Sequence, residues 1–366
     1  MTSHPGAAVA VELQARPATT TTHGAVDAPR RLAAPVPREM QAVTYDTFGS
    51  PDVLQLRDVA VPQPGPGEVL VRIRAAATNP WDWHFMRGLP YIARINGAGV
   101  RRPKHPVLGG DIAGEVVATG TGAARFGIGD RVYGFIEFGG FAEYAVAPES
   151  LLAAMPVNLT FEQAAAVPLA ATTALQGLRD VGRVQPGDRV LVIGASGGVG
   201  TFAVQLANWF GAHVTAVTSG RNGALARSIG ADHVLDYTRE DVTAGDDRYD
   251  LVLQLAGTAS ASDLRRILAP GGRLVMSSGD AANRWIGPMG RVLRGVIAGK
   301  RSRQSIALLT AKWNSVDLEV LAGLLEAGNI VPVIDSTYPL ADVADAIRYV
   351  ESGRARGKVL VSVVRP

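Results

Sequence analysis

Gly194-Ala195-Ser196-Gly197-Gly198-Val199-Gly200 is the stretch that decides the fold. The residues before it, 188–193 (DRVLVI), form a short apolar run that is typical of a buried β-strand. After it, apolar residues recur at helical spacing up to Gly211, at Val199, Ala203, Leu206, Ala207 and Phe210. A strand, a glycine-rich turn and a helix make a site for a phosphate. Glycines let the backbone approach the ligand, and free N–H groups at the helix start stabilise its charge.

The spacing Ala195-x-Gly197-x-x-Gly200 matches the dinucleotide-binding fingerprint, with alanine in its first place. We therefore predict that this turn holds the pyrophosphate of a dinucleotide. The alternative is an ordinary glycine-rich turn. The predicted cofactor-binding residues of the turn are Ala195, Ser196, Gly197, Gly198, Val199 and Gly200.

Size and composition limit the other possibilities. With 366 residues, 47% of them hydrophobic and 19% charged, the chain is long enough for about two globular domains. The net charge of +3 and the absence of a dense basic run argue against nucleic acid or a membrane as the main partner. The chain has no cysteine, which excludes disulfides and cysteine-bound metals and suits a reducing cytoplasm, the location we expect. No apolar run approaches the ~20 residues that span a bilayer.

The first part of the chain divides into a tail and a strand-rich region. Residues 1–38 are rich in Ala, Thr and Pro without any period, so we predict a disordered tail. They do not resemble a signal peptide, and Met40 is an alternative start. From Met40 to about 167, short strands and turns predict a small, irregular β-barrel. The segment 89–105 has no clear period and is either a loop over the site or a surface excursion.

From Phe161 onward, strands and helices alternate, which predicts an α/β fold with a doubly wound parallel sheet. The basic stretch 284–303 is interpreted as a solvated helix-loop insertion. The last strand, 358–363, is expected to return to the first domain. Strands are predicted at 213–218, 233–235, 251–255, 273–277 and, as one further candidate, 305–309, with helices at 261–268 and 318–325.

The end of the second strand after the glycine turn bears on the choice of cofactor. In this fold an acidic residue about 20 residues past the glycines binds the ribose 2′-hydroxyl of NAD, whereas a basic residue accommodates the NADP phosphate. The sequence here is Thr218-Ser219-Gly220-Arg221, without an acid. Ser219 can hydrogen-bond a 2′-phosphate and Arg221 can pair with it. NADP(H) is therefore the predicted cofactor, unless Arg221 is an ordinary surface residue.

Several further stretches accompany the glycine turn: 49–54 (GSPDVL), 79–82 (NPWD), 109–114 (GGDIAG), 164–168 (AAAVP), 230–237 (GADHVLDY) and 357–359 (GKV). Together they resemble the medium-chain dehydrogenase/reductase superfamily, and within it the zinc-independent quinone oxidoreductase branch. The resemblance covers residues 40–366. It implies a GroES-like catalytic β-barrel of residues 40–165 and 328–366, and a Rossmann NADP-binding domain of residues 166–327.

The resemblance also bears on metal binding. Zinc alcohol dehydrogenases of this superfamily hold zinc with a Cys, a His-Glu pair and a further Cys. The matching places here are Asn79, Gly110-Asp111 and Ala170-Ala171, which cannot hold zinc in its usual manner. The lobe of structural-zinc cysteines is missing too. We predict no metal, since the histidines also lack ligand spacing: His4, His23, His84, His105, His213 and His233.

By the same resemblance, Asn79 is expected beside the nicotinamide, Thr173 near the cofactor, and Lys358 approaching it from the return strand. Tyr237 is expected near the 2′-phosphate. The branch often has a tyrosine shortly after the Asn-x-x-Asp turn, where this chain has Trp83-His84.

The candidate catalytic residues are Asn79, His84 and Tyr91. His84 either supplies a proton, because imidazole titrates near ~6.5, or is a packing residue while water supplies the proton. The aromatic residues of this region either line an apolar cleft or belong to the barrel core: Trp81, Trp83, Phe85 and Tyr91.

The resemblance implies an NADPH-dependent oxidoreductase that transfers hydride to a quinone, an α,β-unsaturated carbonyl or a ketone without zinc. The cofactor supplies the hydride chemistry, and the protein orients it. We also expect a homodimer. The alternatives are a zinc-independent alcohol dehydrogenase and a non-catalytic NADPH-binding protein.

Overall fold

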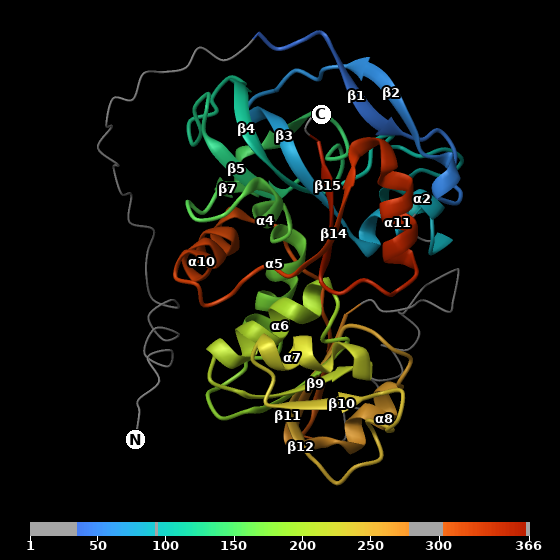
Figure 1. Ribbon diagram of the computed structural model, residues 1–366, viewed down its shortest axis with the longest axis vertical. Helices are drawn as coiled ribbons and strands as arrows, with labels where there is room; N and C mark the ends of the chain where they lie inside the picture. Colours follow the sequence, from blue (N-terminus) through green and yellow to red (C-terminus); the bar gives the residue numbers. More distant parts are fainter. Residues whose placement is uncertain (1–34, 92–93, 278–302, 364–366) are drawn as a thin grey trace.

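The computed structural model describes residues 35–91, 94–277 and 303–363. The predictions for the tail up to residue 34 and for most of the basic stretch 284–303 lie outside these residues. The described chain forms two bodies, each built on one large sheet. Figure 1 shows the barrel strands at one end and the parallel sheet at the other, with α5 and α6 between them.

The barrel is built around β3 (Glu68–Thr78), which pairs antiparallel with three strands. Its side chains are buried on both faces: Val69, Val71 and Ile73 lie in one core, while Leu70 packs in another. The sheet has the order β14-β15-β3-β4-β5-β7, with β6 also on β3, and β1 and β2 form a separate pair. The other strands are β1 (Glu39–Thr44), β2 (Gln55–Ala60), β4 (Asp111–Thr119), β5 (Arg131–Phe135), β6 (Tyr144–Pro148), β7 (Leu152–Ala154), β14 (Ile334–Pro339) and β15 (Lys358–Ser362).

The second sheet is parallel throughout, with the order β10-β9-β8-β11-β12-β13. The doubly wound parallel sheet predicted from the sequence is thus confirmed. The chain builds outward from β8 through β9 to β10 and then from β11 through β12 to β13, so its direction reverses between β8 and β11. Ligands bind beyond the carboxyl ends of the strands at such a reversal. The strands are β8 (Arg189–Ile193), β9 (His213–Thr218), β10 (His233–Asp236), β11 (Tyr249–Gln254), β12 (Leu268–Met276) and β13 (Ser305–Leu308).

Helices cover both faces of this sheet. Val190 and Val192 of β8 share a core with α5 and α6, whereas Leu191 between them packs with α8. Since neighbouring strand residues point to opposite faces, α5 and α6 lie on one face and α8 on the other. The helices are α2 (Pro80–Arg87), α4 (Phe161–Ala165), α5 (Pro168–Gln176), α6 (Gly198–Trp209), α7 (Gly223–Ser228), α8 (Ala261–Arg266), α10 (Ser315–Glu326) and α11 (Val343–Glu351). Within the described ranges, none is long and apolar enough to cross a membrane.

One local prediction needs correction and another is refined. Helix α8 ends at Arg266 rather than at 268, because β12 already begins at Leu268. The pairing of β12 with β11 jumps from Leu268 opposite Tyr249 to Arg273 opposite Leu251, so the strand continues through an irregularity at the Pro-Gly-Gly turn. In the segment 89–105, expected to be either a loop over the site or a surface excursion, the five residues Arg94–Ala98 form a π-helical turn, a detail that the sequence did not indicate.

Candidate active site

The glycine turn connects β8 to α6. Gly194 has a φ of 89°, a conformation that glycine adopts without strain. A Cβ on Gly200 would lie 2.1 Å from the carbonyl oxygen of Gly194, so only glycine lets the helix approach the strand this closely. At Gly197, the N-cap of α6, the nearest protein atom to a Cβ would be 3.5 Å away. Among the described residues, no atom other than the carbonyl oxygen of Gly194 and the chain neighbours lies within 4 Å of that position.

Ser196 in this turn is held by the end of β9. Its hydroxyl oxygen accepts hydrogen bonds from Thr218 Oγ1 at 2.8 Å and from Asn222 Nδ2 at 3.0 Å. Asn222 is 5% exposed, and its Oδ1 has no partner among the described residues. The sequence analysis missed Asn222, although it directly follows Arg221. An unpaired buried acceptor beside the glycine turn is a suitable group for a ligand hydroxyl or amine.

The three residues predicted for the 2′-phosphate lie at the carboxyl ends of β9 and β10. Ser219 is half-buried and Arg221 is exposed on the short turn that follows β9. Tyr237 is 60% exposed, and its N–H donates to the carbonyl of Thr218 at 3.3 Å. Asp236 also reaches this edge, because a Cβ on Gly220 would lie 2.5 Å from its Oδ2.

Asp236 is an acid that the sequence analysis did not consider there. Hydrogen bonds from the side chain and backbone of Thr238 lower the pKa of Asp236. Arg239 lies 3.7 Å from its second oxygen. The carboxylate is thus already engaged by neighbours of its own loop.

Asn79 and Asp82 form the start of α2. The backbone N–H of Asn79 donates to Asp82 Oδ2 at 2.7 Å, and Pro80 takes the first helical position. The other oxygen of Asp82 accepts from the N–H of Gly109 at 3.0 Å. Asp82 is completely buried. Burial raises its pKa to about 7, and the charge of Asp111 adds to the rise, although both hydrogen bonds and the charge of Lys358 oppose it.

Lys358, the first residue of β15, joins Asn79 to Asp111. Its ammonium donates to Asp111 Oδ2 at 2.8 Å, to Asn79 Oδ1 and to the carbonyl of Thr78 at 3.3 Å. Asn79 Nδ2 donates to the same Asp111 oxygen at 3.0 Å, and Leu169 N–H donates to the other at 2.7 Å. Lys358, Asn79 and Asp111 are 2%, 3% and 0% exposed. They form a buried ion pair that also fixes the carboxamide.

This network occupies the region that the resemblance assigns to zinc. Asn79 and Asp111 stand at two of the places matched to zinc ligands, and the ammonium of Lys358 lies between them. Among the residues that the structure describes, no group of three or more His, Cys, Asp or Glu side chains could hold a metal ion. Thr173 lies on α5, where its hydroxyl donates to the carbonyl of Leu169 at 2.6 Å. The helix thus carries both Thr173 and the N–H group that binds Asp111.

The other two candidate catalytic residues lie along α2 and the segment after it. The ring of His84 stacks on Trp83 with centroids 3.6 Å apart, and its Nδ1 lies 3.1 Å from the carbonyl of Leu89. Tyr91 faces the guanidinium of Arg94, 5.1 Å from the ring centroid. Arg94 also donates to the carbonyls of Arg87 and Gly88, which anchors the start of the 89–105 segment to the end of α2.

Aromatic side chains from distant stretches of the chain meet near Asp111. Trp81 on α2 lies 5.8 Å from Phe135 at the end of β5, and Phe135 lies 4.4 Å from Trp313, which precedes α10. A Cβ on Gly110 would lie 2.1 Å from the Phe135 ring, so this cluster borders the buried ion pair. Trp81 Nε1 is buried without a partner in the described chain. The aromatic cluster consists of Trp81, Phe85, His105, Phe135, Phe138 and Trp313.

We expected the four aromatic residues either to line an apolar cleft or to belong to the barrel core, and they separate: Trp83 and Phe85 pack against the barrel core. Trp81 and Phe85 join the aromatic cluster, 4.6 Å apart. Trp83 stacks on His84 and also packs against the barrel core, and Tyr91 faces Arg94.

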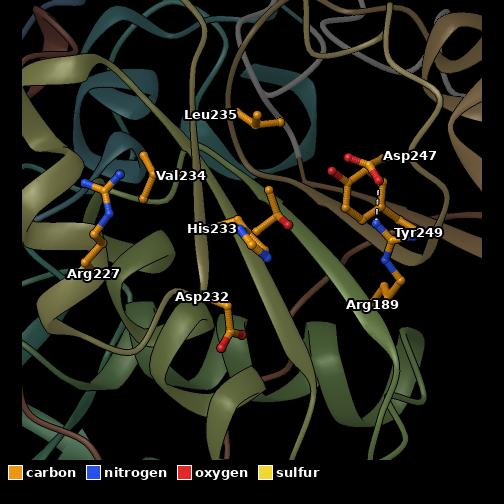
Figure 2. Close-up of a pocket in the computed structure, with 9 residues that line it drawn as sticks. Arg189, Arg227, Asp232, His233, Val234, Leu235, Asp247 and Tyr249 are labelled. Atoms are coloured by element: carbon orange, nitrogen blue, oxygen red, sulfur yellow. Dashed lines mark hydrogen bonds and ion pairs between the residues drawn. The ribbon is translucent and has the colours of Figure 1, made fainter.

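A cavity of about 420 Å³ lies away from the predicted site residues (Figure 2). It is lined mainly by the first residues of β8, β10 and β11, at the opposite end of the strands from the glycine turn. Arg189 pairs there with Asp247 at 2.7 Å, and His233 lies between this pair and Arg227 in Figure 2. Charges of both signs line it, and none of the predicted site residues does, so we do not take it as the active site.

A β-barrel beside a six-stranded parallel sheet, with a glycine turn where the sheet reverses, is the architecture of a class of nicotinamide-dependent oxidoreductases. Two family models match the chain: "Alcohol dehydrogenase GroES-like domain" over residues 65–157 and "Zinc-binding dehydrogenase" over residues 229–361. The chain belongs to the medium-chain dehydrogenase/reductase superfamily, in its quinone oxidoreductase-like branch.

Relatives with assigned activities support this membership. The chain is 37% identical over 340 residues to the 2-methylene-furan-3-one reductase of Solanum lycopersicum. This alignment covers 89% of this chain and 80% of the relative. It is 34% identical to the chloroplastic NADPH-dependent alkenal/one oxidoreductase of Arabidopsis thaliana, over 90% of this chain and 81% of the relative. The solved quinone oxidoreductase of Coxiella burnetii superposes with a TM-score of 0.79 at 30% identity, covering 89% and 100% of the two chains.

Proposed function

We propose that this protein uses NADPH to reduce quinones or α,β-unsaturated carbonyls. One observation carries the proposal. The buried Lys358–Asp111 pair and Asn79 lie between the glycine turn and the aromatic cluster. The names of the relatives, which include an enone reductase and a quinone oxidoreductase homolog, support the same substrate class.

The residues of the turn fit a dinucleotide. The unfilled space beside Gly197 and the unpaired Oδ1 of Asn222 are suited to a ligand that lies along the start of α6. Ser219, Arg221 and Tyr237 would hold the 2′-phosphate of NADPH, and Asn79 and Thr173 would lie toward the nicotinamide. When bound, NADPH supplies the hydride. Asp236 at the same edge is engaged by Thr238 and Arg239, which reduces its conflict with a phosphate.

The aromatic cluster supports a flat, conjugated substrate. Trp81 and Trp313 are far apart in the sequence, and both contact Phe135. Aromatic faces favour stacking with conjugated rings and exclude water. Reduction leaves negative charge on the substrate oxygen, which a hydrogen-bond donor stabilises. The unpartnered N–H of Trp81 is one such donor, and His84 is the candidate for supplying the proton.

Two alternatives differ in what they require. A zinc-independent alcohol dehydrogenase would oxidise alcohols with NADP⁺, and a non-catalytic protein would bind NADPH without turnover. A homodimer and a cytoplasmic location remain predictions.

The test is a panel of quinones, enones, enals and saturated ketones, with consumption of NADPH followed by absorbance. We expect turnover with quinones or enones that exceeds turnover with saturated ketones of similar size. Tight NADPH binding without turnover on any of them would contradict the proposal, and faster alcohol oxidation than carbonyl reduction would favour the alcohol dehydrogenase.

A further inference from the structure

Two consecutive residues, Gly357 and Lys358, connect the phosphate-binding turn to Asn79. The N–H of Gly357 donates to the carbonyl of Ser196 at 2.8 Å, and Gly357 forms a β-bridge with Gly197. The stem of Lys358 lies against the start of α6, since a Cβ on Gly198 would be 3.0 Å from Lys358 Cδ. The backbone of Gly357 thus contacts the glycine turn, while the ammonium of Lys358 reaches into the barrel.

The far end of Lys358 has no spare hydrogen bond in this arrangement. Its three N–H groups match three acceptors: Asp111 Oδ2, Asn79 Oδ1 and the carbonyl of Thr78. The Asn79 carboxamide is held at both ends, because its oxygen accepts from Lys358 and its nitrogen donates to Asp111. Rotation of the carboxamide would break both contacts, so the ion pair determines which way Asn79 faces.

Stability alone does not explain such a pair. Removing two charges from water is costly, and replacing a buried ion pair by apolar residues of similar volume is often neutral or stabilising. Lys358 and Asp111 are 2% and 0% exposed, so the cost of desolvation is large here. A buried pair at this position is better explained by the geometry that it imposes on Asn79 and on the turn.

We propose that Lys358, held by Asp111, is a positioning residue that sets the Asn79 carboxamide relative to the nicotinamide and couples this setting to the phosphate-binding turn. The proposal rests on the proposed function, because it assigns the nicotinamide to the side of Asn79. It differs from the expectation that Lys358 binds the cofactor directly, since here the ammonium acts through Asn79.

The test uses the double variant Lys358→Met/Asp111→Asn, which removes both charges together and leaves no unpaired buried ion. Lys312→Met is the matched control, since Lys312 is exposed and outside this network. For each protein we would measure the melting temperature, the Kd for NADPH, kcat with the best substrate of the panel, and the fluorescence of bound NADPH. The fluorescence reports the surroundings of the nicotinamide ring and needs no turnover.

We expect the double variant to keep most of its melting temperature and an NADPH Kd within about threefold of the original, because the phosphate contacts remain. Its kcat should fall by about 10- to 100-fold, the loss typical of small misplacements of reacting groups. The fluorescence of bound NADPH should shift as well, and Lys312→Met should change none of these.

Three outcomes would overturn or separate the proposals. Original kcat and fluorescence in the double variant would exclude the positioning role. A large rise in the NADPH Kd would instead make Lys358 a direct cofactor ligand. If the unaltered protein reduces no substrate, the proposed function fails, while the fluorescence still tests the positioning role. Should the double variant not fold, Lys358→Arg keeps the charge pair with Asp111 but moves the donor that faces Asn79, and it is expected to give a smaller loss of kcat and a shift of the fluorescence in the same direction.

Discussion

Gly200 lies so close to Gly194 that a Cβ on it would be 2.1 Å from the Gly194 carbonyl oxygen, whereas a Cβ on Gly197 would meet nothing nearer than 3.5 Å. The two glycines of one turn therefore have different reasons to lack a side chain. Gly200 is required by the fold. Gly197 has a φ of −81° that alanine readily adopts, and the described residues leave room for its Cβ, so we predict that this position serves a ligand rather than the fold.

The paired variants Gly200→Ala and Gly197→Ala separate these reasons. We expect Gly200→Ala to lower the melting temperature clearly, because β8 and α6 must move apart. We expect Gly197→Ala to melt near the original temperature but to bind NADPH at least ~10-fold more weakly, since its methyl group would occupy the space of the pyrophosphate. Calorimetry and NADPH titration check both, and an unchanged NADPH affinity in Gly197→Ala would remove the turn from the cofactor site.

Arg221 tests the choice of nicotinamide cofactor. If it pairs with the 2′-phosphate, NADPH should bind more tightly than NADH by about 1–3 kcal/mol, as for a charge-assisted hydrogen bond. Arg221→Ala should reduce this preference and leave NADH affinity nearly unchanged. Arg227→Ala is the matched control, because Arg227 is exposed on the next helix and faces the cavity of Figure 2. Equal affinity of the unaltered protein for both cofactors would contradict the NADP prediction.

Asp82 should make folding stability depend on pH. Burial raises its pKa to about 7 in the folded protein from the ordinary value of 3.8. The folded state therefore binds more protons than the unfolded state between these values, and this contribution to stability is present below about pH 4 and lost as the pH rises through about 7.

Asp82→Asn removes this titration. We expect the variant to be less stable at all pH values, because its amide cannot accept both N–H bonds of Asn79 and Gly109. The fall in unfolding free energy between pH 5 and 8 should nevertheless be smaller than in the original. Denaturant titrations at several pH values measure it, with exposed Asp58→Asn as control. An equal pH slope in Asp82→Asn and the original protein would contradict a protonated Asp82.

His84 tests the source of the proton. His84→Gln keeps much of the side-chain volume and some hydrogen bonding but removes the group that titrates. If His84 donates the proton, kcat should fall by roughly 10²-fold or more while NADPH affinity is retained. Steady-state kinetics over a range of pH would show this, and a kcat within a few-fold of the original would mean that water supplies the proton.

A substitution at Trp81 tests whether its indole N–H binds the substrate. Trp81→Phe keeps an aromatic ring beside Phe135 but removes the buried N–H that lacks a partner. If the N–H binds the substrate oxygen, kcat/KM for a quinone should fall by about 5- to 10-fold, the equivalent of one hydrogen bond of about 1–1.5 kcal/mol. The melting temperature should hold or rise, because an unsatisfied donor is removed. An unchanged kcat/KM would assign Trp81 to packing alone.

Local patterns predicted much of the architecture. The apolar run of β8, the glycine turn and the alternation of strands and helices led directly to the parallel sheet, since each depends on neighbours in the chain. The irregularity of β12 was missed because the Pro-Gly-Gly turn within it favours a strand boundary by its composition. Only the pairing with β11 shows that the strand continues on both sides.

The site was predicted less completely. Asn79 and Lys358 came from the family resemblance, but their contact did not. Asp111 and Lys358 are 247 residues apart, and no spacing rule joins residues at that distance. Asn222 and Trp313 were missed for a similar reason: the relevance of Asn222 depends on an unpaired atom, and that of Trp313 on a contact with Phe135, far away in the sequence. Such features follow from packing in three dimensions.

The return of β15 to β3 has a consequence for synthesis on the ribosome. Thr78 of β3 hydrogen-bonds the carbonyl of Val359, 281 residues later in the chain. At a translation rate of about 5–20 residues per second, this partner is synthesised on the order of 15–55 seconds after β3. During that time the parallel sheet can assemble, while the end of β3 at Ala75–Thr78 still lacks the strand that pairs with it. The barrel is thus the part translated first and completed last.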